Sequence, residues 1–339
     1  MNKGDWLYLT YFCGTCFCGV SALAANTAQA ANEIPLHRDS VVRFATRAEG
    51  AALLKTRDRF VAAMSPFDRQ ARLKVSRAVD EQEYLRFASA QAIDWEPQHV
   101  EQLTAVIDAL RKHLAGLRLP LPKTVMLVRT TGQEEGGAAY CRGNGIILPQ
   151  GKPGASEDAA QRLLLHELFH ILSSHQRELR HRLYALIGFR PCQEIQLPGD
   201  LRDRKITNPD GPVIAYYIEL REDNQRFLVA PVLFSSVDRF PPGAKNFFGV
   251  MQFKLMQVES ENDRWRARLV EGQPILLDVD TREKIPASFF AQIGQNTGYV
   301  IHPDEILADN FVHLVLGKKK LPSPELIREM RRLLSTDRR

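Results

Sequence analysis

Three residues in one short apolar segment have the types and spacing needed to hold a metal ion and use it. Residues 163–172 read L-L-L-H-E-L-F-H-I-L, which places Glu167 between His166 and His170. On an α-helix, positions i and i+4 lie on the same face, so the two imidazole rings point to a common place. That arrangement suits a zinc ion, whose bonds to histidine nitrogen are about 2 Å long.

Glu167 follows His166 by about 100° around the helix, so it lies beside the metal position. Zinc lowers the pKa of a bound water from 15.7 to about 7, and a neighbouring carboxylate can then take its proton. H-E-x-x-H on a helix is the metalloprotease pattern. The alternative is a pair of core histidines hydrogen-bonded to carbonyl groups beside a surface glutamate. We favour the metal site because one segment supplies both ligands and base.

A catalytic zinc site needs a third protein ligand. The metzincin pattern would continue with glycine at 173 and histidine at 176, but the chain has Ser173 and Gln176. Three other candidates follow within a basic, amphipathic stretch that we predict to be a solvated second helix: His175, Glu178 and His181.

A more distant segment offers a better third ligand. Pro303 is a helix-start signal, and Glu305 and Asp309 then lie one turn apart on the predicted helix. A ligand carboxylate followed by a second carboxylate fits a zinc site, because a zinc-binding histidine needs an acceptor for its other ring N–H. The alternative is an ordinary acidic helix start favoured by the helix dipole.

Together, the H-E-x-x-H at 166–170 and the E-x-x-x-D at 305–309 resemble the gluzincin zinc metallopeptidases, the thermolysin-like group. The resemblance covers these two short segments. It implies one Zn²⁺ per chain held by His166, His170 and Glu305, with Glu167 as general base and Asp309 orienting His166. The two segments lie further apart than in thermolysin-like enzymes, and Asp304 stands where that group usually has asparagine.

The N-terminus predicts export. Lys3 precedes an apolar run from Trp6 to Ala25, and A-Q-A at 28–30 is a cleavage signal. We therefore predict a signal peptide at 1–30 and a periplasmic or secreted protein. The alternative is an uncleaved N-terminal membrane anchor, for which the run is long enough.

Two cysteines remain after residue 30, Cys141 and Cys192. In an oxidising compartment an even pair favours a disulfide. Two buried free thiols are the alternative.

The patterns along the chain predict an α+β protein with a zincin-like catalytic unit. We expect a helical N-terminal region at 31–120, with a capping box at Thr46 and Glu49, and a zincin sheet with the active-site helix at 121–190. A β-rich insert at 191–300 then separates that helix from the third-ligand helix and a last amphipathic helix at 301–339. Ser156 is expected to cap the active-site helix.

The predicted function is hydrolysis of a peptide or protein substrate by a zinc-dependent metallopeptidase. The net charge of +5 is mild and its charges are interspersed, so no nucleic-acid partner is expected. Membrane contact is expected only if the signal segment is retained. The alternatives are a non-catalytic binding or envelope protein on a zincin scaffold, and a zinc hydrolase of a non-peptide amide or ester. Four side chains are candidates for stabilising the oxyanion: Tyr216, Tyr217, Tyr299 and His302.

Overall fold

The computed structural model describes residues 33–152, 154, 156–222, 224–278 and 286–335. The predicted signal peptide lies outside these ranges. Apart from Glu33, the first residue of the first strand, the helices and sheets that follow belong to one compact unit, Ile34–Arg339. Helices make up 41% and strands 25%, which confirms the predicted α+β class.

The first sheet has the strand order β1-β2-β3-β5-β4. β2, β3 and β5 run parallel, and β4 pairs antiparallel with β5 at one edge. β3 and β5 are largely buried, as expected for parallel strands covered on both faces. The strands are β1 (Glu33–His37), β2 (Ser40–Phe44), β3 (Thr124–Thr130), β4 (Tyr140–Arg142) and β5 (Gly145–Pro149).

The region at 31–120 therefore begins with two strands, where the sequence predicted helices. The cause is long-range pairing: β2 aligns with β3, with Val41 opposite Thr124 and Phe44 opposite Leu127. The rest is helical as predicted, and Thr46 and Glu49 form the expected capping box. These helices are α2 (Arg47–Leu54), α3 (Arg59–Ala63), α4 (Pro66–Leu73), α5 (Glu81–Ala90) and α6 (Pro97–Leu114).

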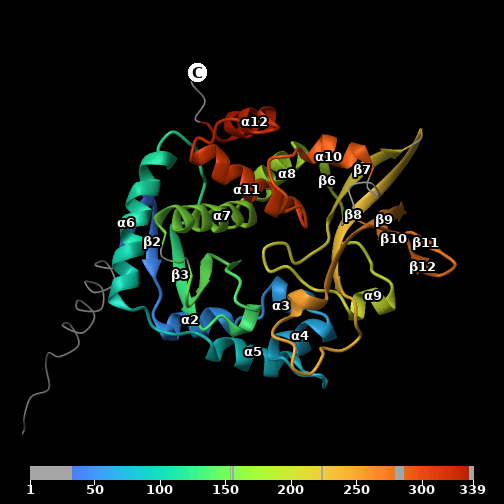
Figure 1. Cartoon of the computed structure of the whole chain (residues 1–339), viewed down its shortest axis with the longest axis horizontal. Coiled ribbons are helices and arrows are strands. Elements are labelled where there is room, and N and C mark those ends of the chain that lie inside the picture. The colour runs from blue at the N-terminus through green and yellow to red at the C-terminus, as the bar shows by residue number, and fades with distance from the viewer. Residues whose placement is uncertain (1–32, 153, 155, 223, 279–285, 336–339) are drawn as a thin grey trace, which may run out of the picture. The chain divides into compact units, whose positions relative to one another are not determined.

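Helix α7 (Glu157–His175) carries the H-E-x-x-H segment and is capped by Ser156, as predicted. It packs against β4, β5 and α6, and also against α11 (Pro303–Val315) (Figure 1). The predicted second helix is α8 (Arg177–Ala185). One apolar core joins the first sheet to α6, α7, α11 and the C-terminal helix α12 (Pro324–Leu334). Among the described residues, no helix combines the length and apolar character needed to cross a bilayer.

The strands predicted between α8 and α11 form a second, antiparallel sheet in the order β10-β9-β8-β7-β6, with β13 also paired to β9. A two-stranded ribbon and short helices complete this part of the chain. The strands are β6 (Phe189–Pro191), β7 (Tyr216–Glu222), β8 (Gln225–Ser235), β9 (Met251–Glu261), β10 (Arg264–Ala267), β11 (Leu269–Val270), β12 (Gln273–Pro274) and β13 (Leu276–Asp278). The short helices of this part are α9 (Gly199–Asp203), η2 (Phe247–Val250) and α10 (Ala287–Ile293), whereas η1 (Gln133–Glu135) lies between β3 and β4.

Candidate metal centre

The contact between α7 and α11 brings three predicted ligands together. His166, His170 and Glu305 each offer one donor atom, and these atoms lie within 4.8 Å of one another. Glu305 Oε2 is 3.0 Å from His166 Nε2 and 3.5 Å from His170 Nε2. His170 and Glu305 are buried, and His166 is partly buried. Two nitrogens and one carboxylate oxygen therefore face a common point.

The other nitrogen of each ring has a carboxylate partner. His166 Nδ1 lies 3.1 Å from Asp309 Oδ1, the partner that the sequence indicated. His170 Nδ1 lies 2.7 Å from Asp304 Oδ2. A neutral imidazole that donates through Nδ1 keeps its Nε2 lone pair for a metal. Both rings are thus oriented with Nε2 directed toward Glu305.

Asp304 is a site residue that the sequence analysis did not assign. Besides His170, its carboxylate accepts hydrogen bonds from Ser173 Oγ at 2.5 Å and Tyr184 Oη at 2.7 Å. These contacts hold a fully buried charge between α7, α8 and the start of α11. The available signal was Ser173, which follows His170 by three positions and so lies on the same face of the helix.

Asn208 holds the other oxygen of Glu305, and sequence reasoning missed it as well. Its Nδ2 donates to Glu305 Oε1 at 2.7 Å, and its Oδ1 accepts from the backbone N–H of Asp210 at 3.0 Å. Asn208 belongs to the irregular segment between α9 and β7, where no periodic pattern indicated a function. Glu305 is therefore oriented from both sides.

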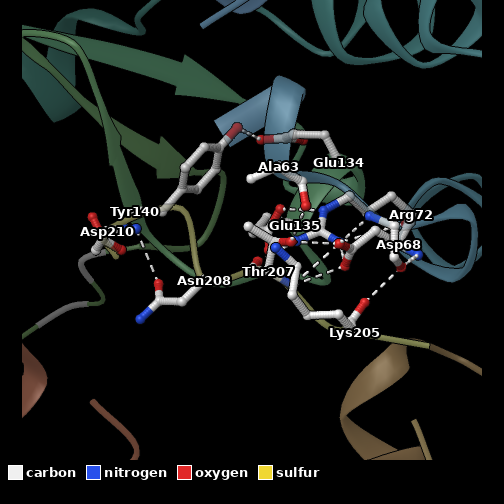
Figure 2. A network of polar contacts seen from close by, with 11 residues as sticks. Ala63, Asp68, Arg72, Glu134, Glu135, Tyr140, Lys205, Thr207, Asn208 and Asp210 are labelled. Atoms are coloured by element: carbon white, nitrogen blue, oxygen red, sulfur yellow. Dashed lines mark hydrogen bonds and ion pairs between the residues drawn. The ribbon is translucent and has the colours of Figure 1, made fainter. Parts of the chain in front are cut away.

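A buried ion network anchors this segment one residue before Asn208 (Figure 2). Arg72 donates to Asp68 at 2.7 Å, to Glu135 at 2.8 and 2.6 Å, and to the Thr207 carbonyl at 3.0 Å. The backbone N–H and hydroxyl of Thr207 in turn donate to Asp68. α4 and η1 thereby fix where the segment enters the metal centre.

The predicted base, Glu167, is buried beside the three ligands. Cys141 Sγ donates to Glu167 Oε2 at 3.4 Å, and Cys141, Glu167 and Asp210 form a second cluster within 4.8 Å. Burial raises the pKa of Glu167, although His170 and His166 act in the opposite direction. A raised pKa brings a carboxylate closer to the range in which it can accept and return a proton.

The charges of the three ligands are coupled. Burial alone would lower the pKa of His166, but hydrogen bonds to Asp309 and Glu305 outweigh it and raise the pKa to about 10. The pKa of His170 is likewise raised, against burial, by Asp210, Glu305 and Asp304. The pKa of Glu305 is held well below its usual range, again against burial, by the two histidines. The histidines and the carboxylates therefore each favour the charged form of the other.

The two cysteines are not bridged. Cys141 and Cys192 are both free thiols, so the predicted disulfide gives way to the alternative of two thiols. Cys141 is buried, and its sulfur donates to the side chain of Glu167. Cys192 is only partly buried, in the segment after β6.

The remaining candidates lie at different distances from the ligands. His181 Nδ1 lies 3.0 Å from Tyr216 Oη and is not part of the ligand cluster. Tyr217 stacks on Trp265 in the second sheet, at 4.5 Å between ring centroids. The ring centroid of Tyr299 lies 6.3 Å from that of His166, and His302 caps the start of α11. Of the four oxyanion candidates, Tyr299 is the one for which the described structure has a ring contact with a candidate ligand.

One of the three candidate ligands, His170, lines a cavity of about 900 Å³. His170, Cys141 and Asp210 line it at the metal end. Asp210 Oδ1 also accepts the backbone N–H of Cys141 at 2.9 Å, on the edge strand β4. An extended peptide could pair with that N–H only if Asp210 moved aside.

Comparisons with protein-family models, with curated proteins and with solved structures found no match. The function is therefore argued from the geometry of the site.

Proposed function

We propose that this chain is a zinc-dependent metallopeptidase of the gluzincin type, built on a zincin-like scaffold. The observation that carries the proposal is the orientation of the two histidines. Each ring gives Nδ1 to a carboxylate and directs Nε2 toward Glu305, with Glu167 buried alongside. Two histidines that only fill the core would have no reason to direct both Nε2 atoms toward the same carboxylate.

The donor set fits zinc. Two imidazole nitrogens and one carboxylate are the protein ligands of catalytic zinc sites that keep a position open for water. Of the three proposed ligands, His170 lines the cavity, and we infer that a substrate would reach the zinc from that side. The sheet with an antiparallel edge strand beside the ligand helix supports the zincin-like assignment.

When bound, zinc would supply Lewis acidity toward the scissile carbonyl and lower the pKa of its water. Glu167 would accept the proton from that water and later donate it to the leaving amine. Asp309 and Asp304 would hold the ligand histidines in the tautomer that presents Nε2. Asn208 would keep the second oxygen of Glu305 occupied. Tyr299 is the side chain we favour for stabilising the oxyanion.

The first test is metal content. We expect about one zinc per chain in the wild-type protein and little in Glu305→Ala, by elemental analysis. Zinc retained in Glu305→Ala would show that another residue is the third ligand. A protein without affinity for zinc would favour the non-catalytic binding role.

The second test concerns the base. Glu167→Gln should keep its zinc and lose hydrolysis of a mixed peptide library, because glutamine cannot accept the proton. Unchanged hydrolysis by Glu167→Gln would rule out this mechanism. Hydrolysis confined to non-peptide amides or esters would keep the mechanism and change the substrate class.

Export through residues 1–30 remains part of the proposal, and N-terminal sequencing of the purified protein would test it.

A further inference from the structure

Two arginines of α8 line the same cavity as the metal centre. The cavity has His170, Asp210 and His302 on its wall, and it reaches Arg177 and Arg180. Arg177 is exposed and Arg180 is partly buried. α8 follows directly after α7, so these arginines are positioned by the helix next to the H-E-x-x-H helix.

The partners of both arginines are neutral groups. Arg180 Nε donates to Tyr216 Oη at 3.1 Å, and its guanidinium lies 5.9 Å from the centre of that ring. Arg177 Nε donates to His181 Nε2 at 3.2 Å. A guanidinium has five N–H donors, so most donors of both side chains remain free for a ligand within the described structure.

Arg59 of α3 also lines the cavity and is exposed, and the other charged groups on the wall differ from the α8 arginines. Arg142 is buried and paired with Asp58 at 2.7 Å, and it also donates to two backbone carbonyls. Asp210 accepts from the Cys141 N–H at the metal end. Glu194 also lines the cavity but is exposed. In the part of the chain that the structure describes, no ion pair joins Glu194 or Asp210 to the α8 arginines.

We propose that Arg177 and Arg180 bind a carboxylate of the substrate, so that the enzyme prefers peptides carrying an acidic side chain or a free C-terminus near the scissile bond. The inference rests on the proposed peptidase function. Guanidinium groups bind carboxylates through paired, charge-assisted hydrogen bonds. The aromatic ring of Tyr216 on one side of Arg180 strengthens such a pair by excluding water.

The test measures binding without turnover. Zinc-loaded Glu167→Gln protein is titrated with three versions of one blocked hexapeptide. The first has an internal glutamine and an amidated C-terminus, the second replaces glutamine with glutamate, and the third keeps glutamine but has a free C-terminal carboxylate. We expect at least one charged peptide to bind about tenfold more tightly than the neutral one, as a charge-assisted hydrogen bond provides. Which one binds identifies the source of the carboxylate.

In the same background, Arg177→Gln with Arg180→Gln should abolish the preference for the charged peptide over the neutral one. Arg182→Gln is the matched control, because Arg182 is an exposed arginine of α8 that does not line the cavity. If the double variant fails to fold, Arg177→Gln alone should still reduce the preference, since Arg177 is exposed.

The outcomes separate this inference from the proposed function. Equal binding of all three peptides, or no binding, overturns the carboxylate preference even if the wild-type protein hydrolyses peptides. A carboxylate preference that the arginine variants abolish supports the inference. If the wild-type protein then hydrolyses no member of the mixed peptide library, the peptidase function fails and carboxylate binding remains.

Discussion

At the scale of single residues, the hydrogen bond at Nδ1 of each histidine determines whether its Nε2 is available to bind a metal. Asp304 fixes His170 through a 2.7 Å contact while it also receives Ser173 and Tyr184. We predict that Asp304→Ala lowers zinc affinity about 10- to 100-fold, the usual cost of losing a partner of a metal ligand. Competition with a zinc chelator measures this. Asp158→Ala, at the exposed start of α7, is the control and should leave affinity unchanged. Equal zinc affinities of Asp304→Ala and the wild-type protein would show that Asp304 does not support metal binding.

Asn208 permits a sharper comparison, because its amide donates to Glu305. Asn208→Ala removes the donor and should lower zinc affinity by about tenfold. Asn208→Asp places a carboxylate against the Glu305 carboxylate, and a bound Zn²⁺ relieves their repulsion, so this variant should bind zinc more tightly than Asn208→Ala does. Chelator competition on both variants tests the order. If neither differs from wild type, Asn208 does not position Glu305.

The sequence predicted the residues whose relation is local and missed those whose relation depends on folding. His166, Glu167 and His170 share one helical turn, and Glu305 and Asp309 share another, so i, i+4 spacing was enough to find them. Asn208 belongs to an irregular segment, and its role depends on where α9, β7 and α11 meet. No periodicity within its own segment carries that information.

At the scale of elements, the network of Asp68, Arg72 and Glu135 connects α4 and η1 to the segment that delivers Asn208. Arg72 is fully buried, so removing it leaves two buried carboxylates without their cation. We predict that Arg72→Met destabilises the protein by about 3–5 kcal/mol. Urea unfolding measures this change.

Arg77→Met is the matched control for Arg72→Met. Arg77 also pairs with a glutamate, Glu83, but at an exposed position, where such pairs contribute little. The Arg77→Met variant should unfold at the same urea concentration as the wild-type protein. Similar losses in both variants would mean that burial of the network is not what stabilises this region.

Among the helices and strands too, the sequence predicted the features that depend on nearby residues and missed those that depend on distant ones. Helix caps at Thr46 and Ser156 were predictable because the capping partner is three residues away. β1 and β2 were not, because β2 is defined by parallel pairing with β3 some eighty residues later. The strands between α8 and α11 were found because apolar and polar residues alternate along them.

At the scale of the whole molecule, the metal centre joins parts of the chain that are far apart. His166 and Glu305 are separated by 139 positions, and the second sheet lies between them in sequence. A metal that binds only the folded arrangement stabilises the fold as a whole. Its binding is also linked to protons, because the ligand histidines must be neutral.

The linkage predicts how stability changes with pH. In the metal-free protein, the pKa of His166 is raised from 6.5 to about 10, so its contribution to stability is complete below pH 6.5 and is lost as the pH rises toward 10. The lowered pKa values of Glu305 and Asp309 act oppositely, and their contribution is lost as the pH falls into the acid range. Zinc binding displaces the histidine protons, so the apparent zinc affinity should rise with pH between 6.5 and 10. The urea midpoint of chelator-treated protein should therefore fall over this range relative to that of zinc-loaded protein, so that the gap widens. A gap that stays constant with pH would show that zinc does not replace protons on these histidines.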